Sequence, residues 1–464
     1  MTKEPTDQMT TDTKPSEDAK PAYFSPADPL TGRTKVPGDK SISHRALILS
    51  ALAIGKSEIS GLLEGEDVLA TAAALRAMGA KIEHEDSLWT VHGVGVGGLM
   101  QPEMAIDLGN SGTSVRLLMG LVASHDISVT FLGDASLSKR PMGRVIDPLT
   151  AMGADFTARQ TIDGQSCLPL TVRGLSPAVA MEYRLPVASA QVKSAILLAG
   201  LNTPGITRVI EPVPTRDHSE TMLKGFGADI LVEVDGQDNR IISLVGEAEL
   251  APQKITVPGD PSSAAFPIVA ALLVPGSDIV VENVGINATR AGLFTVLRQM
   301  GGDISFENQR TVGGEPVADI HVKHSKLTAM DVPADIVPSM IDEFPILFVA
   351  AAMAQGQTTT TGLSELRVKE SDRLSQMAEG LLMLGVDITE NTDGLVITGS
   401  GGKLLTAQVD GAAIKTALDH RIAMSFAVAG LVTETGVSVD DMSPTETSFP
   451  GFSDILAALQ SNPR

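Results

Sequence analysis

Apolar runs with helical spacing alternate with strand-like runs along most of the chain, and a similar tetrapeptide marks each change from helix to strand. Residues 75–78 end one helix-like run, and Gly79-Ala80-Lys81-Ile82 opens the strand-like run that follows. Glycine readily adopts the left-handed conformation that ends many helices, so each tetrad predicts a helix end followed by a strand. The other tetrads begin at Gly153, Gly227, Gly301 and Gly385.

The tetrads recur at a nearly constant spacing. The first four tetrads follow one another at equal intervals, and only the last interval, from Gly301 to Gly385, is slightly longer. Such regularity indicates repeated copies of one α/β unit. Residues 422–431 form a further apolar run after Asp419 and predict a sixth, truncated copy. We therefore expect an α/β fold of six units with internal pseudo-symmetry.

A longer repeat divides these units into two halves. Val36-Pro37-Gly38-Asp39 matches Val257-Pro258-Gly259-Asp260, and Gly55 matches Gly276 at the same offset. At 464 residues the chain is too long for one ordinary core, so we expect two domains of three units each. The predicted domains are residues 39–256 and residues 31–38 plus 257–464, and the chain crosses between them at the two Val-Pro-Gly-Asp segments.

Residues 1–30 are acidic and polar and lack the apolar core of a secretion signal, so we expect them to form a disordered tail. Apolar runs such as residues 346–353 are shorter than a bilayer span, which excludes a membrane protein. Cys167 is the single cysteine, which excludes an internal disulfide and a cysteine-rich metal site. These observations predict a cytoplasmic location.

The formal net charge is −21, and the chain has one Trp and two Tyr. This composition disfavours a nucleic-acid surface of basic stripes and stacking rings, so we expect a small-molecule ligand. Against this background, cations gather beside small and hydroxylic residues just before apolar helices. The loops are residues 40–45, 110–116 and 189–194, and further cations lie in residues 139–144, 215–218, 366–373 and 419–421.

Helix N-termini with Ser, Thr and Gly bind anions through free backbone N–H groups. The alternative for Ser41, Ser111 and Ser189 is that each only caps its helix. Repetition of the pattern with Lys and Arg favours a positive cleft for an acidic substrate.

Two carboxylates stand in motifs otherwise suited to anions. Asp342 lies among apolar residues, and Glu370 lies beside Lys369 and three residues before Arg373. Either setting can tune a pKa for proton transfer. The alternatives are a helix cap for Asp342 and a structural ion pair for Glu370. The glycine-rich residues 93–98 precede no helix and predict a turn, and the histidines lack the spacing of a zinc site, so no metal is expected.

Five motifs in one order resemble the 5-enolpyruvylshikimate-3-phosphate synthase family. They are residues 40–45, 109–113, 139–144, 367–373 and 419–424, while residues 189–194 and 339–343 are most similar to its bacterial class II type. The resemblance covers residues 35–452. It implies a two-domain inverse α/β barrel of six βαβαββ units, which agrees with the repeats found above.

The resemblance implies transfer of the enolpyruvyl group of phosphoenolpyruvate to the 5-hydroxyl of shikimate 3-phosphate through a tetrahedral intermediate, with release of phosphate and without a cofactor. It implies that Asp342 takes the hydroxyl proton and that Glu370 with Lys40 handles the methylene proton. It also implies that shikimate 3-phosphate is held by Lys40, Ser41, Arg45, Ser189, Ala190, Gln191, Arg216, Asp342 and Lys369. The residues implied for phosphoenolpyruvate are Lys40, Asn110, Gly112, Arg140, Gln191, Arg373 and Arg421.

Two positions depart from many family members. Ala190 stands where many have Ser, so its contact would come from the backbone, and Thr447 stands where many have Lys. Glyphosate, the family's known inhibitor, is expected to bind over Gly112, and a monomer is expected. The alternatives are a UDP-N-acetylglucosamine enolpyruvyl transferase and a non-catalytic phosphate-binding protein of the same fold. The first commonly has a reactive Cys in the loop that here is residues 133–141, which contain none.

Overall fold

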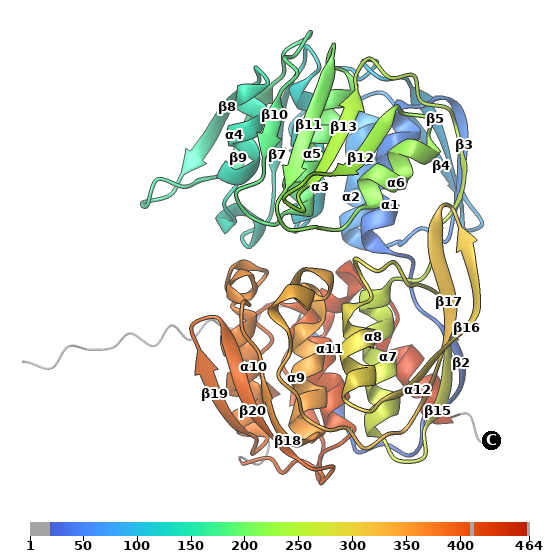
Figure 1. The fold of residues 1–464 in the computed structure, drawn as a ribbon, viewed down its shortest axis with the longest axis vertical. Coiled ribbons are helices and arrows are strands. Elements are labelled where there is room, and N and C mark those ends of the chain that lie inside the picture. Colours follow the sequence, from blue (N-terminus) through green and yellow to red (C-terminus); the bar gives the residue numbers. More distant parts are fainter. Residues whose placement is uncertain (1–18, 409–412, 462–464) are drawn as a thin grey trace, which may run out of the picture.

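A computed structural model describes residues 19–408 and 413–461. The described chain forms two lobes, one above the other in Figure 1. Each lobe has its own cluster of buried apolar side chains. One cluster runs from Ile42 to Val257 and defines what we call the first lobe. The other combines Leu30 and Val36 with residues between Ala264 and Leu459 and defines the second lobe. The domain boundaries drawn from the sequence remain a prediction, which this division of the core supports.

A short strand stands just before each Val-Pro-Gly-Asp segment and pairs in parallel with a strand of one lobe. Strand β2 (Thr31–Lys35) precedes the first lobe in sequence but pairs in parallel with β15 (Asp278–Gly285) of the second. Strand β14 (Lys254–Thr256) is the last strand of the first lobe in sequence and pairs in parallel with β3 (Ile54–Ser60) of the same lobe. The chain therefore crosses at both Val-Pro-Gly-Asp segments.

Backbone hydrogen bonds and a buried arginine join the two crossing segments. The Asp39 N–H donates to the Pro258 carbonyl at 2.8 Å, and the Asp260 N–H donates to the Pro37 carbonyl at 2.9 Å. The Arg290 guanidinium lies 2.9 Å from the carboxylates of both Asp39 and Asp260. Each of these aspartates also caps a helix, α1 (Lys40–Leu52) or α7 (Pro261–Leu273). The two crossing segments are thus joined by buried ion pairs as well as by backbone hydrogen bonds.

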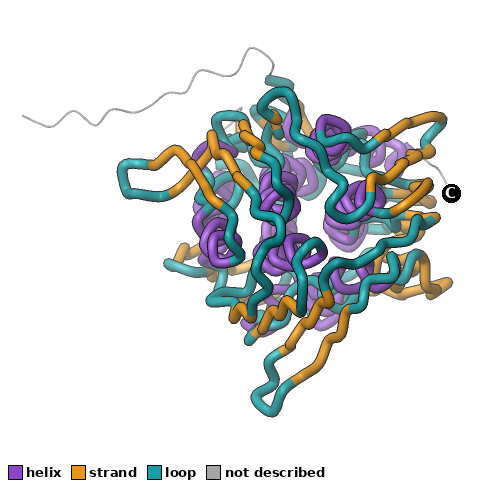
Figure 2. Tube along the Cα trace, turned by 90° about the horizontal axis from the view of Figure 1, so that it is seen from above, coloured by secondary structure: helices purple, strands orange, loops and turns teal. Residues whose placement is uncertain are grey.

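The helices fill the interior and the sheets lie outside. Every residue of α7 and of α9 (Phe344–Met353) is buried. Figure 2 shows helices at the centre of the molecule and strands around its rim. A helix that is apolar on all sides must be covered on all sides, which explains why sheets surround these helices. The prediction of a two-domain α/β fold is confirmed.

The predicted glycines do end helices. Gly79, Gly153, Gly227, Gly301 and Gly385 all have positive φ, from 76° to 105°, and each directly follows the C-cap residue of a helix. An L side chain at these positions would be strained, so glycine is required there. The remaining helices are α2 (Glu66–Ala77), α3 (Gly112–Ala123), α4 (Gly143–Ala151), α5 (Ala190–Leu201), α6 (His218–Gly225), α8 (Gly292–Gln299), α10 (Arg373–Met383), α11 (His420–Gly430) and α12 (Phe452–Ser461).

The described residues form six sheets, three around each core. Four of them have four strands, in which one neighbouring pair at an edge is parallel and the other two pairs are antiparallel, as in the order β6-β7-β9-β8. The number of repeat units remains a prediction. The first lobe has β4 (Lys81–Glu85), β5 (Leu88–Val94), β6 (Ile106–Asp107), β7 (Ser128–Leu132), β8 (Asp155–Gln160), β9 (Ser166–Arg173), β10 (Glu182–Arg184), β11 (Ile206–Glu211), β12 (Ile230–Val234) and β13 (Arg240–Val245). The second has β1 (Ala22–Phe24), β16 (Asp303–Val312), β17 (Glu315–Lys323), β18 (Gln355–Thr359), β19 (Asp387–Asn391), β20 (Gly394–Ser400), β21 (Ala413–Ile414) and β22 (Val437–Val439).

The predicted tail over residues 1–30 is too long. Strand β1 pairs antiparallel with β22, with Ala22 opposite Val439, and Leu30 is fully buried in the second core. The apolar residues of this segment complete a sheet, which the acidic composition of the preceding residues concealed. The remainder of the predicted tail, before Ala19, lies outside the described part of the chain.

Candidate active site

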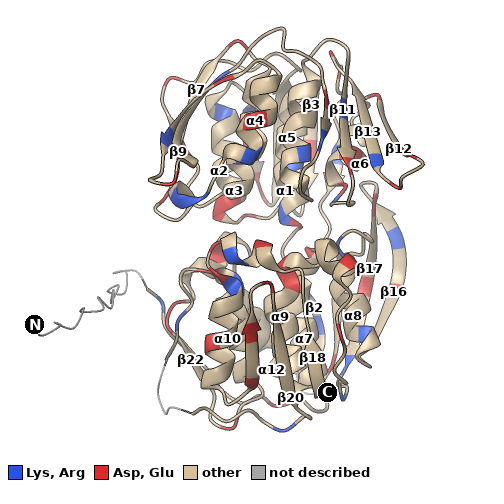
Figure 3. Cartoon of the chain, turned by 60° about the vertical axis from the view of Figure 1, so that its left-hand side comes forward, with Lys and Arg blue, Asp and Glu red and all other residues tan. Residues whose placement is uncertain are grey.

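The predicted site residues stand at helix starts or in the loops just before them. Lys40 begins α1, Gly112 begins α3, Ala190 begins α5, Arg373 begins α10, and Arg421 is the second residue of α11. Charged residues of both signs lie at the facing ends of the two lobes (Figure 3). The remaining predicted residues, Ser41, Arg45, Asn110, Arg140, Ser189, Gln191, Arg216, Asp342, Lys369 and Glu370, lie in the same helix starts or in the loops beside them.

The Asp342 carboxylate contacts cationic side chains from both lobes. Arg216 of the first lobe donates to it at 2.6 Å. Lys369 and Arg373 of the second lobe lie 3.2 and 3.3 Å from it. Arg421 donates to the Asp342 backbone carbonyl at 3.0 Å. Since Asp342 is not the cap of α9, the helix-cap alternative is wrong.

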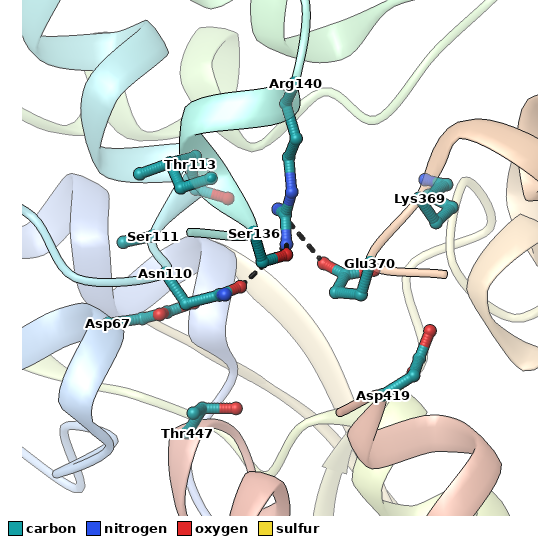
Figure 4. A network of polar contacts seen from close by, with 12 residues as sticks. Asp67, Asn110, Ser111, Thr113, Ser136, Arg140, Lys369, Glu370, Asp419 and Thr447 are labelled. Atoms are coloured by element: carbon teal, nitrogen blue, oxygen red, sulfur yellow. Dashed lines mark hydrogen bonds and ion pairs between the residues drawn. The ribbon is translucent and has the colours of Figure 1, made fainter. Parts of the chain in front are cut away.

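The Glu370 carboxylate forms a second junction between the lobes. It lies 2.5 Å from Arg373 and 3.4 Å from Arg140 of the first lobe. Arg140 also donates to the Asn110 side-chain oxygen at 2.6 Å, so the start of α3 is tied to the same cation (Figure 4). The ion pair with Arg373 that was the alternative for Glu370 is therefore present, and it extends across the lobes to Arg140.

Both carboxylates are held in the charged form. Burial raises the pKa of Asp342, but the charges of Lys369, Arg216, Arg421 and Arg373 outweigh burial and hold that pKa well below its usual range. Burial likewise raises the pKa of Glu370, and Arg373, Arg140, His420 and Lys369 bring it well below the usual range. Anions that occupied these cations would weaken this effect and make both carboxylates stronger bases.

Arg45 is fixed by hydroxyl groups of neighbouring helices. Its guanidinium donates to Ser219 at 2.8 Å, to Ser194 at 2.6 Å and to the Ser41 carbonyl at 3.0 Å. Burial lowers the pKa of Arg45 to about 10, which leaves it charged at neutral pH. Gln191 donates to Thr113 at 3.2 Å and thereby joins the starts of α5 and α3. The first lobe thus brings its predicted anion-binding residues onto adjacent helix starts.

The serine loops divide between the two interpretations. The hydroxyl oxygens of Ser111 and Ser189 accept hydrogen bonds from backbone N–H groups of α3 and α5, so both residues cap their helices. Ser41 does not cap α1, because the Asp39 carboxylate accepts from the Ile42 N–H instead. His44, His218 and His420 are all buried.

Gly112 has no positive φ, so the backbone itself does not require glycine there. A Cβ atom at this position would lie 2.9 Å from a terminal nitrogen of Arg116 and of Arg140. The absence of a side chain therefore leaves room for two guanidinium groups.

Three charged residues around the site were not predicted to belong to it. Asp67 forms an ion pair with Lys40. The Asp419 carboxylate lies 2.8 Å from the Arg373 guanidinium. It also accepts a hydrogen bond from the Ser371 hydroxyl at 3.1 Å. Arg290 joins the two crossing aspartates. The repeated aspartates in Val-Pro-Gly-Asp were a usable signal for a buried partner cation, whereas nothing in the local sequence distinguishes Asp67 from its acidic neighbours.

No three or more His, Cys, Asp or Glu side chains of residues 19–408 and 413–461 are arranged to hold a metal ion. Within the same ranges, no helix is long and apolar enough to cross a membrane. The absence of a cofactor remains a prediction.

Comparisons with known proteins agree over nearly the whole chain. The sequence model of the EPSP synthase (3-phosphoshikimate 1-carboxyvinyltransferase) family matches residues 24–456. The 3-phosphoshikimate 1-carboxyvinyltransferase of Novosphingobium aromaticivorans is 65% identical over 438 residues, which are 94% of this chain and 98% of that protein. That of Zymomonas mobilis subsp. mobilis is 65% identical over 440 residues, which are 95% of this chain and 96% of that protein. A solved structure of EPSP synthase from Acinetobacter baumannii has a TM-score of 0.81 at 47% identity and covers 94% of this chain and 97% of that one.

Proposed function

The chain belongs to the EPSP synthase (3-phosphoshikimate 1-carboxyvinyltransferase) family, and on this basis we propose how its residues divide the work of the reaction. The chain transfers the enolpyruvyl group of phosphoenolpyruvate to shikimate 3-phosphate in the shikimate pathway, which leads to chorismate and the aromatic amino acids. The observation that carries the site proposal is the meeting of Arg216, Lys369 and Arg373 around one carboxylate, Asp342.

Shikimate 3-phosphate binds mainly to the first lobe. Its phosphate is held at the start of α5 by Ser189, by the backbone of Ala190 and by Gln191. Ser41 and Arg45 hold its other polar groups, with Lys40, Arg216 and Lys369 beside them. The support for this assignment is the N-terminus of α5 beside a buried, charged Arg45, because helix N-termini bind phosphate through free N–H groups.

Phosphoenolpyruvate binds where Arg140 of the first lobe meets Arg373 and Arg421 of the second. Asn110, the backbone of Gly112, Gln191 and Lys40 complete its contacts. Arginine presents a planar fork that fits both phosphate and carboxylate. The Glu370 carboxylate pairs with two of these arginines, Arg140 and Arg373. Phosphoenolpyruvate therefore displaces Glu370 from them when it binds.

The reaction proceeds by addition and elimination. Asp342 takes the proton of the 5-hydroxyl as its oxygen attacks C2 of phosphoenolpyruvate, and Glu370 with Lys40 delivers a proton to the methylene carbon. A tetrahedral phosphate-bearing intermediate forms. Glu370 with Lys40 then takes a proton back from the new methyl group as phosphate leaves with the C–O bonding pair, which restores the double bond. The cations stabilise charge on the phosphate throughout, which is an electrostatic role.

The UDP-N-acetylglucosamine enolpyruvyl transferase alternative is not favoured. Cys167 is buried beneath the loop before Arg140, with its sulfur 3.6 Å from the Lys139 carbonyl, and so cannot act as an exposed nucleophile. A non-catalytic phosphate-binding role is not favoured either, since both candidate acid-base carboxylates lie among the cations.

The test is phosphate release by the purified chain. We expect release only when phosphoenolpyruvate and shikimate 3-phosphate are both present. Replacing shikimate 3-phosphate by UDP-N-acetylglucosamine should abolish it. Release with the second acceptor would favour the alternative transferase, and no release with either acceptor would leave only a binding role.

Inhibition by glyphosate at the phosphoenolpyruvate site is part of the proposal. A monomer is proposed because one chain supplies both sides of the site. A cytoplasmic location is proposed from the single, unpaired Cys167.

A further inference from the structure

Lys40 occupies a place that is unfavourable for a cation. It is the first residue of α1, where the partial positive charge of the helix N-terminus repels an ammonium group. Arg45 lies on the next turn of the same helix, and the first turn of α1 contains no acidic residue. The nearby carboxylates of Asp39 and Asp260 both pair with Arg290, so a counter-charge for the Lys40 ammonium comes from another element.

Asp67 supplies that counter-charge from the first turn of α2. Its carboxylate forms an ion pair with the Lys40 ammonium, and the Asp67 side chain is only 7% exposed while that of Lys40 is 21% exposed. A carboxylate in the first turn of a helix is favoured by the helix dipole, so α2 stabilises the charge of Asp67 whereas α1 destabilises that of Lys40. Among the described residues, Asp67 is the one carboxylate that pairs with Lys40.

The start of α2 is itself anchored. The Asp67 backbone carbonyl accepts a hydrogen bond from the Ser114 hydroxyl at 3.2 Å, which ties α2 to α3. Ser114 in turn contacts Thr71 at 2.7 Å, and Thr71 contacts His44 of α1 at 2.8 Å. Asp67 is thus held on a buried hydroxyl network that links the three helices whose starts bear Lys40, Asp67 and Gly112.

The neighbouring acids do not share this position. Glu66 precedes Asp67 in the same first turn but is exposed. Glu64 contacts His84 at 2.9 Å and the Trp89 indole N–H at 3.1 Å, so it belongs to the sheet side of the lobe. The contact with Lys40 is therefore specific to Asp67, which lies among the polar residues of Figure 4.

We propose that Asp67 is a positioning residue that holds the Lys40 ammonium where phosphoenolpyruvate and shikimate 3-phosphate meet. The inference rests on the proposed function, in which Lys40 touches both substrates. Lysine has a flexible four-carbon stem, and ordering it during the reaction would cost conformational entropy. An ammonium has three donors, so it can keep one on Asp67 and direct the other two to the two substrates.

The decisive experiment is a double-mutant cycle on kcat/KM with Asp67→Asn and Lys40→Ala. Asp67→Asn keeps the shape of the side chain and removes its charge. We expect it to lower kcat/KM for phosphoenolpyruvate about tenfold or more, because small misplacements of a catalytic group cost up to about a hundredfold. In the Lys40→Ala background the same change should have an effect of less than about twofold, because Asp67 acts only through Lys40.

Glu66→Gln is the matched control, since it removes the neighbouring charge from the same helix turn, and we expect it to leave kcat/KM unchanged. Asp67→Glu keeps the charge and should recover part of the activity. If Asp67→Asn does not fold, the cycle is run with Asp67→Glu, for which the same loss of effect in the Lys40→Ala background is expected.

Equal effects of the Asp67 change with and without Lys40 would overturn the inference, as would wild-type or higher activity of Asp67→Asn. Near-normal activity of Lys40→Ala alone would instead overturn the role given to Lys40 in the proposed function. The two failures are thus distinguishable.

Discussion

Asp342 and Glu370 are weak bases as the protein stands, because each is surrounded by cations that hold its pKa well below the usual range. Both substrates are anions that would occupy these same cations. We infer that substrate binding itself raises the basicity of the two carboxylates, so the chemistry begins only when the site is full. This coupling follows from charge alone and needs no separate trigger.

Gly112 bears on the choice between substrate and inhibitor. A methyl group there would press on the ends of the Arg116 and Arg140 side chains, which can shift, and it would not strain the backbone. We expect Gly112→Ala to raise the glyphosate Ki more than the phosphoenolpyruvate KM, by about 1 to 3 kcal/mol, because the longer inhibitor has less room to adjust. Inhibition and saturation curves of both enzymes measure this difference.

Gly143→Ala is the control for the glycine change, since a Cβ atom there meets nothing within 4 Å. Equal losses for inhibitor and substrate in Gly112→Ala would show that the displaced Arg140 matters to both ligands alike. A wild-type enzyme indifferent to glyphosate would contradict the expected binding mode.

For single residues, the sequence predicts which residue types lie near the site better than it predicts which side chains contact one another. The cationic loops were predicted because cations recur at equivalent loop positions, whereas the individual site residues were implied by the family resemblance. Asp67 was not, because Glu64, Glu66 and Asp67 are alike in sequence and only the packing of α2 against α1 selects one of them. The pairing of Asp342 with Arg216 joins two segments that lie far apart in the chain, which no local pattern contains.

At the scale of elements, helix starts were the best-predicted features and also the source of one error. Ser111 and Ser189 cap α3 and α5 as the N-cap interpretation predicts. Ser41 does not, because Asp39 lies two residues earlier and its carboxylate is the better-placed acceptor. The five glycine tetrads were reliable because a positive φ at a helix end excludes most other residues.

Gly65 sets how closely two elements of different lobes approach. It is the cap of α2, and a Cβ atom there would lie 2.5 Å from the Thr447 carbonyl oxygen, which ends a 3₁₀ helix (Ser443–Thr447) of the second lobe. We expect Gly65→Ala to push the lobes apart at this contact and to lower kcat/KM about tenfold, since misplacement of about 1 Å can cost up to a hundredfold.

Steady-state kinetics and solution scattering of Gly65→Ala measure these two effects. Gly225→Ala is the matched control. Gly225 likewise lies at one end of a helix, has no positive φ and has no neighbouring atom within 4 Å of the position that a Cβ atom would take. Unchanged kinetics in Gly65→Ala would show that the contact with Thr447 plays no part in the active arrangement.

At the scale of the whole molecule, polar contacts across the lobes supplement the two chain crossings. Arg144 and Glu365 meet at 2.9 Å near the site, and His218 and Glu315 meet at 2.8 Å near the crossing segments. The two-lobed arrangement could be predicted because the repeats are long and regular. The ion pairs between the lobes could not, because they depend on how the lobes sit against one another.

Buried histidines predict how stability depends on pH. Burial lowers the pKa of His420 to about 4, and burial with the nearby Lys40 and Arg45 charges holds the pKa of His44 well below its usual range. Below about pH 6.5 these histidines take up protons in the unfolded chain but not in the folded one. The free energy of unfolding therefore decreases as the pH is lowered. His420 alone should contribute a loss of about 2 kcal/mol between pH 7 and pH 5.

Urea unfolding at pH 7 and pH 5 measures this loss. His420→Gln should reduce the pH dependence, whereas His92→Gln, whose side chain is 44% exposed, should not. Asp342 and Glu370 also contribute to stability, because their pKa values are depressed in the folded protein. This contribution should be lost only as the pH falls below about 4. Equal stability at pH 7 and pH 5 would contradict the buried neutral histidines.

The central claim is that two carboxylates, brought together with cations of both lobes, perform the proton transfers of enolpyruvyl transfer. The most direct measurement is kcat together with the Kd for shikimate 3-phosphate in Asp342→Asn and Glu370→Gln. The controls are Asp335→Asn and Glu379→Gln, exposed residues of the same segments. We predict that kcat falls by about 10² or more in both site variants while the Kd stays within a few-fold, because acid-base groups typically contribute that much. Near-normal kcat in either variant would remove that carboxylate from the chemistry and contradict the account.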